Sequence, residues 1–144
     1  MSRIGKKPVP IPDKVTVKAN GEVVVKGPKG ELRQRIMPGI RIAVNEAKKQ
    51  VEVTREADTK QVRALHGLLR ALVQNMIHGV TAGYEKKMRI MGTGYRVELQ
   101  GKTLVINAGY CAPVQFPIPP GIEIDVPKAG SREFMNFIVR GIDK

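Results

Sequence analysis

The chain has 144 residues, of which 42% are hydrophobic and only 4% aromatic, which predicts an aliphatic core in one ordinary domain or two very small ones. The formal net charge of +12 indicates a polyanionic partner, and nucleic acid fits better than a membrane surface because no amphipathic helix has a mainly basic polar face. A single cysteine excludes an internal disulfide, and the sequence shows neither a signal peptide nor a long apolar run, so we expect a cytoplasmic protein.

The first 13 residues form a basic, proline-rich stretch. Three prolines at alternate positions disfavour a helix and favour an extended arm. The basic residues on this arm are Arg3, Lys6 and Lys7. Two interpretations stay open: the arm is a loose tail, or it lies along the phosphates of a nucleic acid.

Short runs of alternating apolar and polar residues, separated by turn signals, extend from Val15 to Arg55. We expect a hairpin at Asn20-Gly21 and strands over 22–26, 31–36, 40–44 and 50–55. A further turn carries Lys29, whose flexible ammonium group projects far enough to reach a phosphate. Short strands joined by tight turns predict an antiparallel sheet.

One clear helix is predicted from Thr59 to about His78. Asp58 with Gln61 three positions later resembles a capping box, and Gly79 is expected to end the helix. Apolar residues at every third or fourth position predict a face that covers the sheet: Val62, Leu65, Leu69, Leu72, Val73, Met76 and Val80. The solvent side is expected to carry Lys60, Arg63, Gln74 and His78.

The segment from Gly83 to Arg96 is basic and interrupted by glycines. Its basic residues are Lys86, Lys87, Arg89 and Arg96, and Tyr84 and Tyr95 offer flat faces beside these charges. Either this segment grips a phosphate backbone or it is a charged hairpin between two domains.

The second half of the chain repeats the first. Ile40 to Val44, preceded by Pro-Gly, matches Ile122 to Val126 at an offset of 82 residues. The same offset pairs Val15 with Val97, Val17 with Leu99, Val23 with Val105 and Gly27 with Gly109, and an offset of 85 pairs Arg55 with Arg140 and Asp58 with Asp143.

This repeat predicts an α+β fold of two units, over 14–82 and 83–144, after the arm of residues 1–13. Each unit is expected to be a short antiparallel sheet with one packed helix, and the second unit lacks its helix. Shortening of the chain is the favoured explanation, and coverage of the second sheet by a partner is the alternative.

Candidates for catalysis are few. His66 and His78 lie far apart along the predicted helix and do not form a metal pair. Cys111 has no neighbouring base in the sequence and is expected to be a small buried or half-buried residue. Gly92-Thr93-Gly94 lacks the third glycine of a dinucleotide fingerprint. We therefore predict that the protein is not an enzyme and binds neither a metal nor a cofactor. The rival hypothesis is an enzyme whose active site has an unfamiliar arrangement.

The positive charge favours binding to a nucleic-acid backbone. Nine of the first 35 residues are Lys or Arg and three are acidic. The guanidinium groups of Arg89 and Arg96 can bind phosphate through two hydrogen bonds or stack on a base. The predicted helix is needed for the core, so it is not a recognition helix for the DNA major groove. Folded RNA is the expected partner, and a module that binds RNA or DNA backbones in general is the alternative.

Seven short motifs follow one another along the chain. They are Ser2-Arg-Ile-Gly-Lys-Lys-Pro8, Val25-Lys-Gly-Pro-Lys-Gly-Glu-Leu32, Arg63-Ala-Leu-His-Gly67, Gly83-Tyr84-Glu85-Lys86, Gly92-Thr-Gly-Tyr-Arg96, Asn107-Ala-Gly-Tyr110 and Val139-Arg-Gly-Ile-Asp-Lys144. In these motifs the chain resembles the bacterial form of large-subunit ribosomal protein L-six, over its whole length and in order. Family members continue past the last motif into a second helix and a basic tail.

This resemblance implies a non-enzymatic protein of two homologous α+β units that binds large-subunit ribosomal RNA near the translation-factor-binding centre, beside the sarcin-ricin loop. It implies neighbouring ribosomal proteins and nearby translation factors as partners, and neither a membrane nor a small-molecule substrate. The location is a cytoplasmic ribosome, and an organellar ribosome is also compatible. The RNA-binding candidates are Arg3, Lys6, Lys7, Lys29, Lys86, Lys87, Arg89, Tyr95, Arg96, Tyr110 and Arg132.

Overall fold

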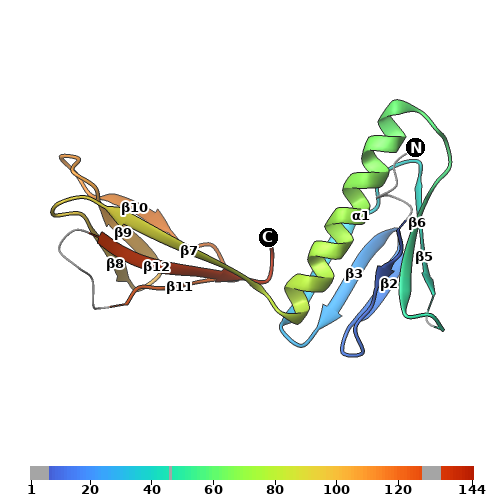
Figure 1. Cartoon of the computed structure of the whole chain (residues 1–144), viewed down its shortest axis with the longest axis horizontal. Helices are drawn as coiled ribbons and strands as arrows, with labels where there is room; N and C mark the ends of the chain where they lie inside the picture. Colours follow the sequence, from blue (N-terminus) through green and yellow to red (C-terminus); the bar gives the residue numbers. More distant parts are fainter. Residues whose placement is uncertain (1–6, 46, 128–133) are drawn as a thin grey trace. The chain divides into compact units, whose positions relative to one another are not determined.

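The computed structural model describes residues 7–45, 47–127 and 134–144 (Figure 1). The chain divides into two compact units. Unit 1 extends to Gly83 and includes Ile142–Lys144, whereas unit 2 comprises Tyr84–Gly141. Among the described residues, no helix is long and apolar enough to cross a membrane.

The described residues of unit 1 form six strands followed by one helix. In chain order these are β1 (Val9–Pro10), β2 (Thr16–Asn20), β3 (Glu22–Gly27), β4 (Gly30–Arg35), β5 (Ile40–Asn45), β6 (Gln50–Arg55) and α1 (Lys60–Thr81). The strands form two antiparallel sheets with the orders β2-β3-β4 and β1-β6-β5. The predicted hairpin is confirmed: Asn20 pairs with Glu22, and Gly21 has a φ of 74°, which glycine adopts without strain.

Unit 2 repeats the strands of unit 1 in the same order. They are β7 (Tyr84–Met91), β8 (Arg96–Gln100), β9 (Thr103–Asn107), β10 (Val114–Pro117), β11 (Ile122–Asp125) and β12 (Phe134–Gly141). The sheet orders β10-β9-β8 and β11-β12-β7 match those of unit 1, with β7 to β12 in the places of β1 to β6. The described part of unit 2 contains no helix. The predicted α+β class, with repeated sheet units and a single helix, is confirmed.

The repeat does not have one constant offset. β2 and β3 are joined through a single residue, Gly21, whereas β8 and β9 are joined through Gly101 and Lys102. When residues are counted back from these two turns, Val17 corresponds to Val97. The predicted match of Val17 with Leu99 is therefore wrong. The extra turn residue also shifts β9 by one position against the prediction, which exchanges the two faces of the strand.

For the later strands, one predicted offset of the repeat agrees with the structure and another does not. Gly39 and Gly121, which precede β5 and β11, have similar φ values of 77° and 86°, so the offset of 82 describes this pair of strands. The predicted match of Arg55 with Arg140 is wrong, however. Arg55 pairs with the first residue of β5, whereas Arg140 pairs with the second residue of β11, Glu123. Neighbouring residues on a strand point to opposite faces, so these two arginines have different surroundings.

The core of unit 1 lies between α1 and the two sheets. Its buried residues are Val9, Val15, Val17, Val23, Val25, Val51, Val73, Met76, Ile77 and Val80. Gly27 allows β3 to approach the helix closely, because a Cβ at this position would lie 2.6 Å from Val80 Cγ2. Each fully buried aliphatic side chain stabilises the fold by about 1.5–3 kcal/mol, so the sheets and α1 depend on each other.

The residue that caps the N-terminus of the helix lies one position after the predicted one. Thr59 is the N-cap, and its Oγ1 accepts a hydrogen bond from the backbone N–H of Val62 at 3.3 Å. The predicted cap, Asp58, instead forms an ion pair with Arg55 Nη2 at 2.8 Å. This competing partner explains why the carboxylate does not cap the helix.

The helix also ends later than predicted. Gly79 is buried inside the last turn, and α1 continues to Thr81. The backbone N–H of Lys29 donates to the Val80 carbonyl at 3.1 Å, which fastens this turn to the turn between β3 and β4. Gly83, with a φ of 81°, follows the C-cap and is the glycine that terminates the helix.

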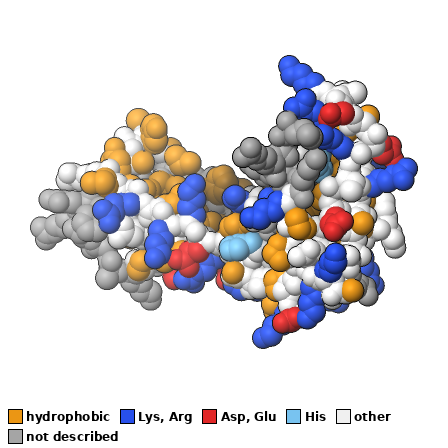
Figure 2. Space-filling view, turned by 45° about the vertical axis from the view of Figure 1, so that its right-hand side comes forward, with side chains coloured by type: hydrophobic (Ala, Val, Ile, Leu, Met, Phe, Trp, Pro, Cys, Tyr) orange, Lys and Arg blue, Asp and Glu red, His pale blue; other side chains and the backbone are white. Residues whose placement is uncertain are grey.

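The core of unit 2 lies between its two sheets and is centred on Val97, Leu104 and Phe137. The apolar face of the β10-β9-β8 sheet continues beyond this core onto three exposed residues. They are Leu99, Val114 and Phe116, with exposed fractions of 45%, 45% and 55%. Figure 2 shows hydrophobic side chains gathered on the surface of unit 2. No described helix covers them as α1 covers the corresponding face in unit 1.

Candidate nucleic-acid interface

The basic segment that opens unit 2 is mainly strand β7, at the edge of its sheet. Side chains alternate between the two faces of a strand, so Lys87 and Arg89 share one face and Lys86 lies on the other. Lys86 pairs with Val139, on the face that also carries the core residue Phe137. All three basic side chains are exposed, but the predicted cluster is divided between two faces of the sheet.

A third cation joins Lys87 and Arg89, and the sequence analysis did not include it among the RNA-binding candidates. Arg140 of β12 lies beside Glu85, with 3.1 Å between Arg140 Nε and Glu85 Oε2, and Lys87 Nζ is 3.8 Å from the same carboxylate. Arg89 Nε donates to Asn136 Oδ1 at 2.8 Å. We call Lys87, Arg89 and Arg140 the basic face of unit 2. Only the pairing of β12 with β7 brings Arg140 to this face, and the large separation of these strands in the sequence hides that pairing.

Tyr95 has a structural role that explains the glycines around it. Its ring is half-buried, and a Cβ at Gly92 would lie 2.6 Å from Tyr95 Cδ2. A Cβ at Gly109 would lie 3.2 Å from the Tyr95 hydroxyl. The ring therefore packs between the β7–β8 loop and the β9–β10 loop, which lie at the same end of unit 2 (Figure 1).

Two further candidates lie near this end of unit 2. Tyr110, in the β9–β10 loop, is 75% exposed, so its ring is accessible for stacking. Arg96 opens β8, pairs with Asn107 of β9 and is exposed. Tyr110 and Arg96 therefore place one accessible aromatic ring and one accessible guanidinium group near the packed ring of Tyr95.

In unit 1, the described part of the arm is attached to the fold. Val9 is buried and pairs with Val51, which adds β1 to the edge of a sheet. The carbonyl of Lys7 accepts a hydrogen bond from Arg70 Nε at 3.2 Å, and the Lys7 side chain is exposed. Arg3 and Lys6 of the arm, and Arg132 of unit 2, lie outside the described residues.

Lys29 lies at the C-terminal end of α1. Its ammonium group donates a hydrogen bond to the carbonyl of Ala82, the C-cap of the helix. A cation at this end also interacts favourably with the helix dipole. Lys29 therefore fastens the β3–β4 turn to the helix, and it remains exposed to solvent.

Comparison with known proteins settles the family. A family model described as "Ribosomal protein L6" matches residues 11–83, about half of the chain. Curated relatives match along its full length. The chain belongs to the ribosomal protein L6 family.

Three relatives of this family, each called "Large ribosomal subunit protein uL6", illustrate the similarity. The chain is 48% identical to the protein of Natranaerobius thermophilus, 47% to that of Acaryochloris marina and 49% to that of Trichodesmium erythraeum. Each match covers 100% of this chain and 77–78% of the relative. The resemblance seen in the sequence motifs is thus confirmed, and the relatives are longer than this chain.

Two polar residues on the buried side of α1 were not predicted in this L6-family chain. His66 is buried, with its Nε2 at 2.8 Å from the Val53 carbonyl, and its Nδ1 has no partner among the described residues. Arg70 is also buried and donates from Nη1 to Gln74 Oε1 at 2.7 Å as well as to the arm. His66 links α1 to β6 and Arg70 links α1 to the arm, so their roles are structural.

The expectation for Cys111 is wrong. This residue is exposed, because it lies in the loop between β9 and β10 and outside the core of unit 2. Within the described ranges, no group of three or more His, Cys, Asp or Glu side chains could hold a metal ion. The hydrogen bond and charge of Lys49 hold the pKa of Asp13 below its ordinary value.

Proposed function

We propose that the chain is a structural constituent of the large ribosomal subunit and binds its ribosomal RNA near the translation-factor-binding centre and the sarcin-ricin loop. The observation that carries this proposal is the full-length match, at about half identity, to relatives called large ribosomal subunit proteins. The net charge of +12 supports an RNA partner. As a member of a ribosomal-protein family the chain is not an enzyme, and its cytoplasmic location follows that of the ribosome.

The proposed mechanism is charge neutralisation on a rigid support. On the basic face of unit 2, the planar guanidinium groups of Arg89 and Arg140 can each bind a phosphate through two hydrogen bonds, and Lys87 adds a point charge. The exposed ion pairs of Glu85 are worth at most about 1 kcal/mol, so phosphate oxygens can replace its carboxylate. Binding of these side chains to phosphates releases the counterions of the RNA to solution, which drives association.

The remaining candidates extend this contact surface. Lys86 reaches phosphates on the opposite face of β7, and Arg96 and Tyr110 offer a guanidinium group and a stacking ring at one end of unit 2. The proposed contacts on unit 1 are those of Lys7 and Lys29, together with Arg3 and Lys6 of the arm. Neighbouring ribosomal proteins and nearby translation factors complete the set of proposed partners.

Sedimentation tests the ribosomal assignment. A tagged chain added to large subunits that lack this protein is expected to move with them through a high-salt gradient. A chain that stays at the top of the gradient but still binds unrelated nucleic acids would favour a general nucleic-acid-binding module instead.

Salt titration tests the proposed residues. The variant Lys86→Gln, Lys87→Gln and Arg89→Gln should flatten the dependence of log affinity for ribosomal RNA on log salt, by about one unit for each phosphate that is no longer neutralised. The matched control is Lys48→Gln, Lys60→Gln and Arg63→Gln, which removes the same charge from other exposed positions. Equal slopes for the two variants would show that β7 faces solvent.

A further inference from the structure

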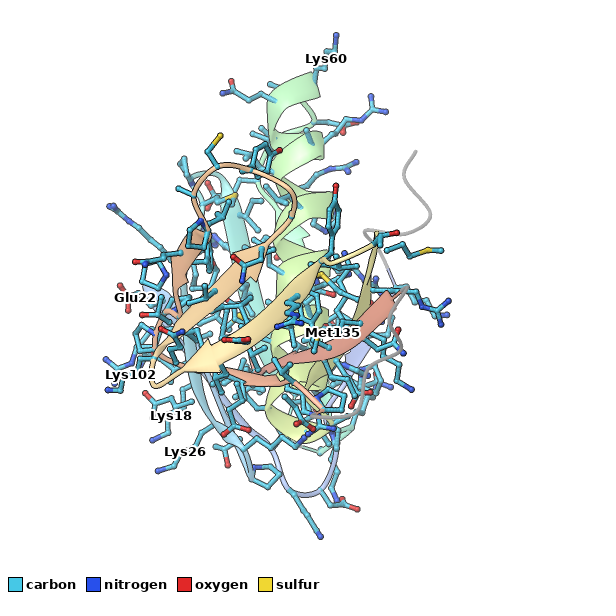
Figure 3. All side chains as sticks on the ribbon, turned by 90° about the vertical axis from the view of Figure 1, so that its left-hand side faces the viewer. Lys18, Glu22, Lys26, Lys60, Lys102 and Met135 are labelled. Atoms are coloured by element: carbon cyan, nitrogen blue, oxygen red, sulfur yellow. The ribbon has the colours of Figure 1, made fainter. Side chains whose placement is uncertain are left out.

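The solvent side of the β2-β3-β4 sheet carries an excess of positive charge that the sequence analysis did not single out. The pairing register places six charged residues on this side: Lys18, Lys26, Arg33 and Arg35 with Glu22 and Glu31. We call this surface the outer face of unit 1. Figure 3 shows Lys18, Glu22 and Lys26 pointing away from the sheet on the same side. The outer face therefore has four cations and two anions.

The register also fixes the spacing of these charges. Lys18 and Arg33 both flank Val24, one on each neighbouring strand, so their backbones are about 10 Å apart at the usual strand spacing. Arg33 and Arg35 are two residues apart on one strand, which separates them by about 7 Å. Such spacing gives each cation its own partner site, which suits a run of phosphates better than a single anion.

Most of these cations are available to a partner. Arg33 is paired with Glu31, with 2.7 Å between Nη2 and Oε1, whereas Lys18, Lys26 and Arg35 form no ion pair with any described residue. All four are exposed. The opposite side of the same strands is fixed against α1 through Val17, Val23 and other buried residues, so the cations stand on a rigid support.

The composition of the outer face distinguishes between classes of partner. Protein interfaces usually have an apolar centre, often with aromatic residues. Here the central residue is Val24, half-buried, and the other uncharged positions are Thr16 and Asn20. A surface of spaced cations around a single half-buried valine, without aromatic residues, fits a phosphate backbone, which needs charge and position rather than buried apolar area.

We propose that the outer face of unit 1 is a second contact for the phosphate backbone of ribosomal RNA, separate from the basic face of unit 2. This inference rests on the proposed function. It assigns RNA contacts to Lys18, Lys26 and Arg35, with Arg33 joining them when phosphate replaces Glu31.

The test compares variants with the wild-type chain in binding to protein-free large-subunit ribosomal RNA over a range of salt concentrations. The outer-face variant is Lys18→Gln, Lys26→Gln and Arg35→Gln. The control is the Lys48, Lys60 and Arg63 variant, which removes the same three charges. Circular dichroism of α1 shows that each variant is folded. The outer-face variant is expected to lose about two units of salt slope and about 100-fold in affinity at roughly 0.1 M salt, and the control much less.

A variant of opposite sign strengthens the test. Glu31→Gln removes a carboxylate from the outer face and releases Arg33, so RNA binding should become several-fold tighter. If the outer-face variant binds like the control, the inference is wrong. It is also wrong if the variant fails to enter large subunits while its binding to naked RNA is unchanged, because the partner is then an acidic protein. If the wild-type chain itself does not bind ribosomal RNA, the proposed function fails, and this inference fails with it.

Discussion

Gly27 offers the sharpest test of how unit 1 is packed. A Cβ at this position would lie 2.6 Å from Val80 Cγ2 and 2.9 Å from the Val80 carbonyl oxygen. Val80 is fully buried and β-branched, so its side chain cannot turn aside easily. Gly27→Ala therefore forces the β3–β4 turn away from α1.

The expected loss of stability has two parts. Overpacking of a filled site costs about 1–3 kcal/mol. The displaced turn also weakens the hydrogen bond from the Lys29 N–H to the Val80 carbonyl, which is worth about 1 kcal/mol. We expect a total of about 2–4 kcal/mol, which lowers the melting temperature of a unit of this size by roughly 10 °C or more.

Thermal or urea unfolding followed by far-ultraviolet circular dichroism measures this effect, because α1 of unit 1 is the one helix among the described residues. The matched control is Gly67→Ala inside α1, where a Cβ meets nothing within 4 Å. This change should stabilise the helix by about 0.5–1 kcal/mol. If the two substitutions shift the transition in the same direction, the close approach of β3 to α1 is not what requires glycine at position 27.

Three further predictions concern unit 1. Thr59→Ala should destabilise α1 by about 1 kcal/mol in urea unfolding, and Asp58→Ala should destabilise it by less. A larger loss of stability for Asp58→Ala would show that Asp58 caps the helix, as expected from the sequence. Lys49→Ala should raise the pKa of Asp13 towards its ordinary value in an NMR titration. Because the folded-state pKa of Asp13 is lowered, its small contribution to stability is present above the unfolded-state pKa and is lost as pH falls through the folded-state pKa. If Asp13 titrates identically in the variant, Lys49 is not the cause of the lowered pKa. Arg70→Ala should speed amide exchange at Val9, the residue of β1 that has an amide proton, since it frees the Lys7 carbonyl before that strand. Unaltered exchange at Val9 would show that the arm is held by β-pairing alone.

Local patterns predicted much of the fold. The hairpin at Asn20-Gly21 follows from the residues that a tight turn requires, and the apolar spacing located α1. Both features depend on residues close together in sequence. The end of the helix was missed because Gly79 is kept helical by contacts of its neighbours with a turn roughly 50 residues earlier, and no local signal records such contacts.

The candidate site was predictable in composition but not in arrangement. The sequence identified β7 as basic, yet it did not separate Lys86 from Lys87 and Arg89, because strand alternation requires the strand to be known. Arg140 joins them only through pairing with a distant strand. The same limit explains the errors in the repeat, where one extra residue in a turn changed which side chains face inward.

The order of elements in unit 1 has a consequence for its synthesis. All six strands precede α1, so a ribosome must translate through Thr81 before the valines on both sheets can be shielded from water. At usual translation speeds of about 5–20 residues per second, the nascent strands remain unprotected for several seconds. Cotranslational folding of this unit is therefore expected to be a single late event that begins when α1 emerges from the ribosome. A chaperone would protect the exposed valines most usefully just before that point.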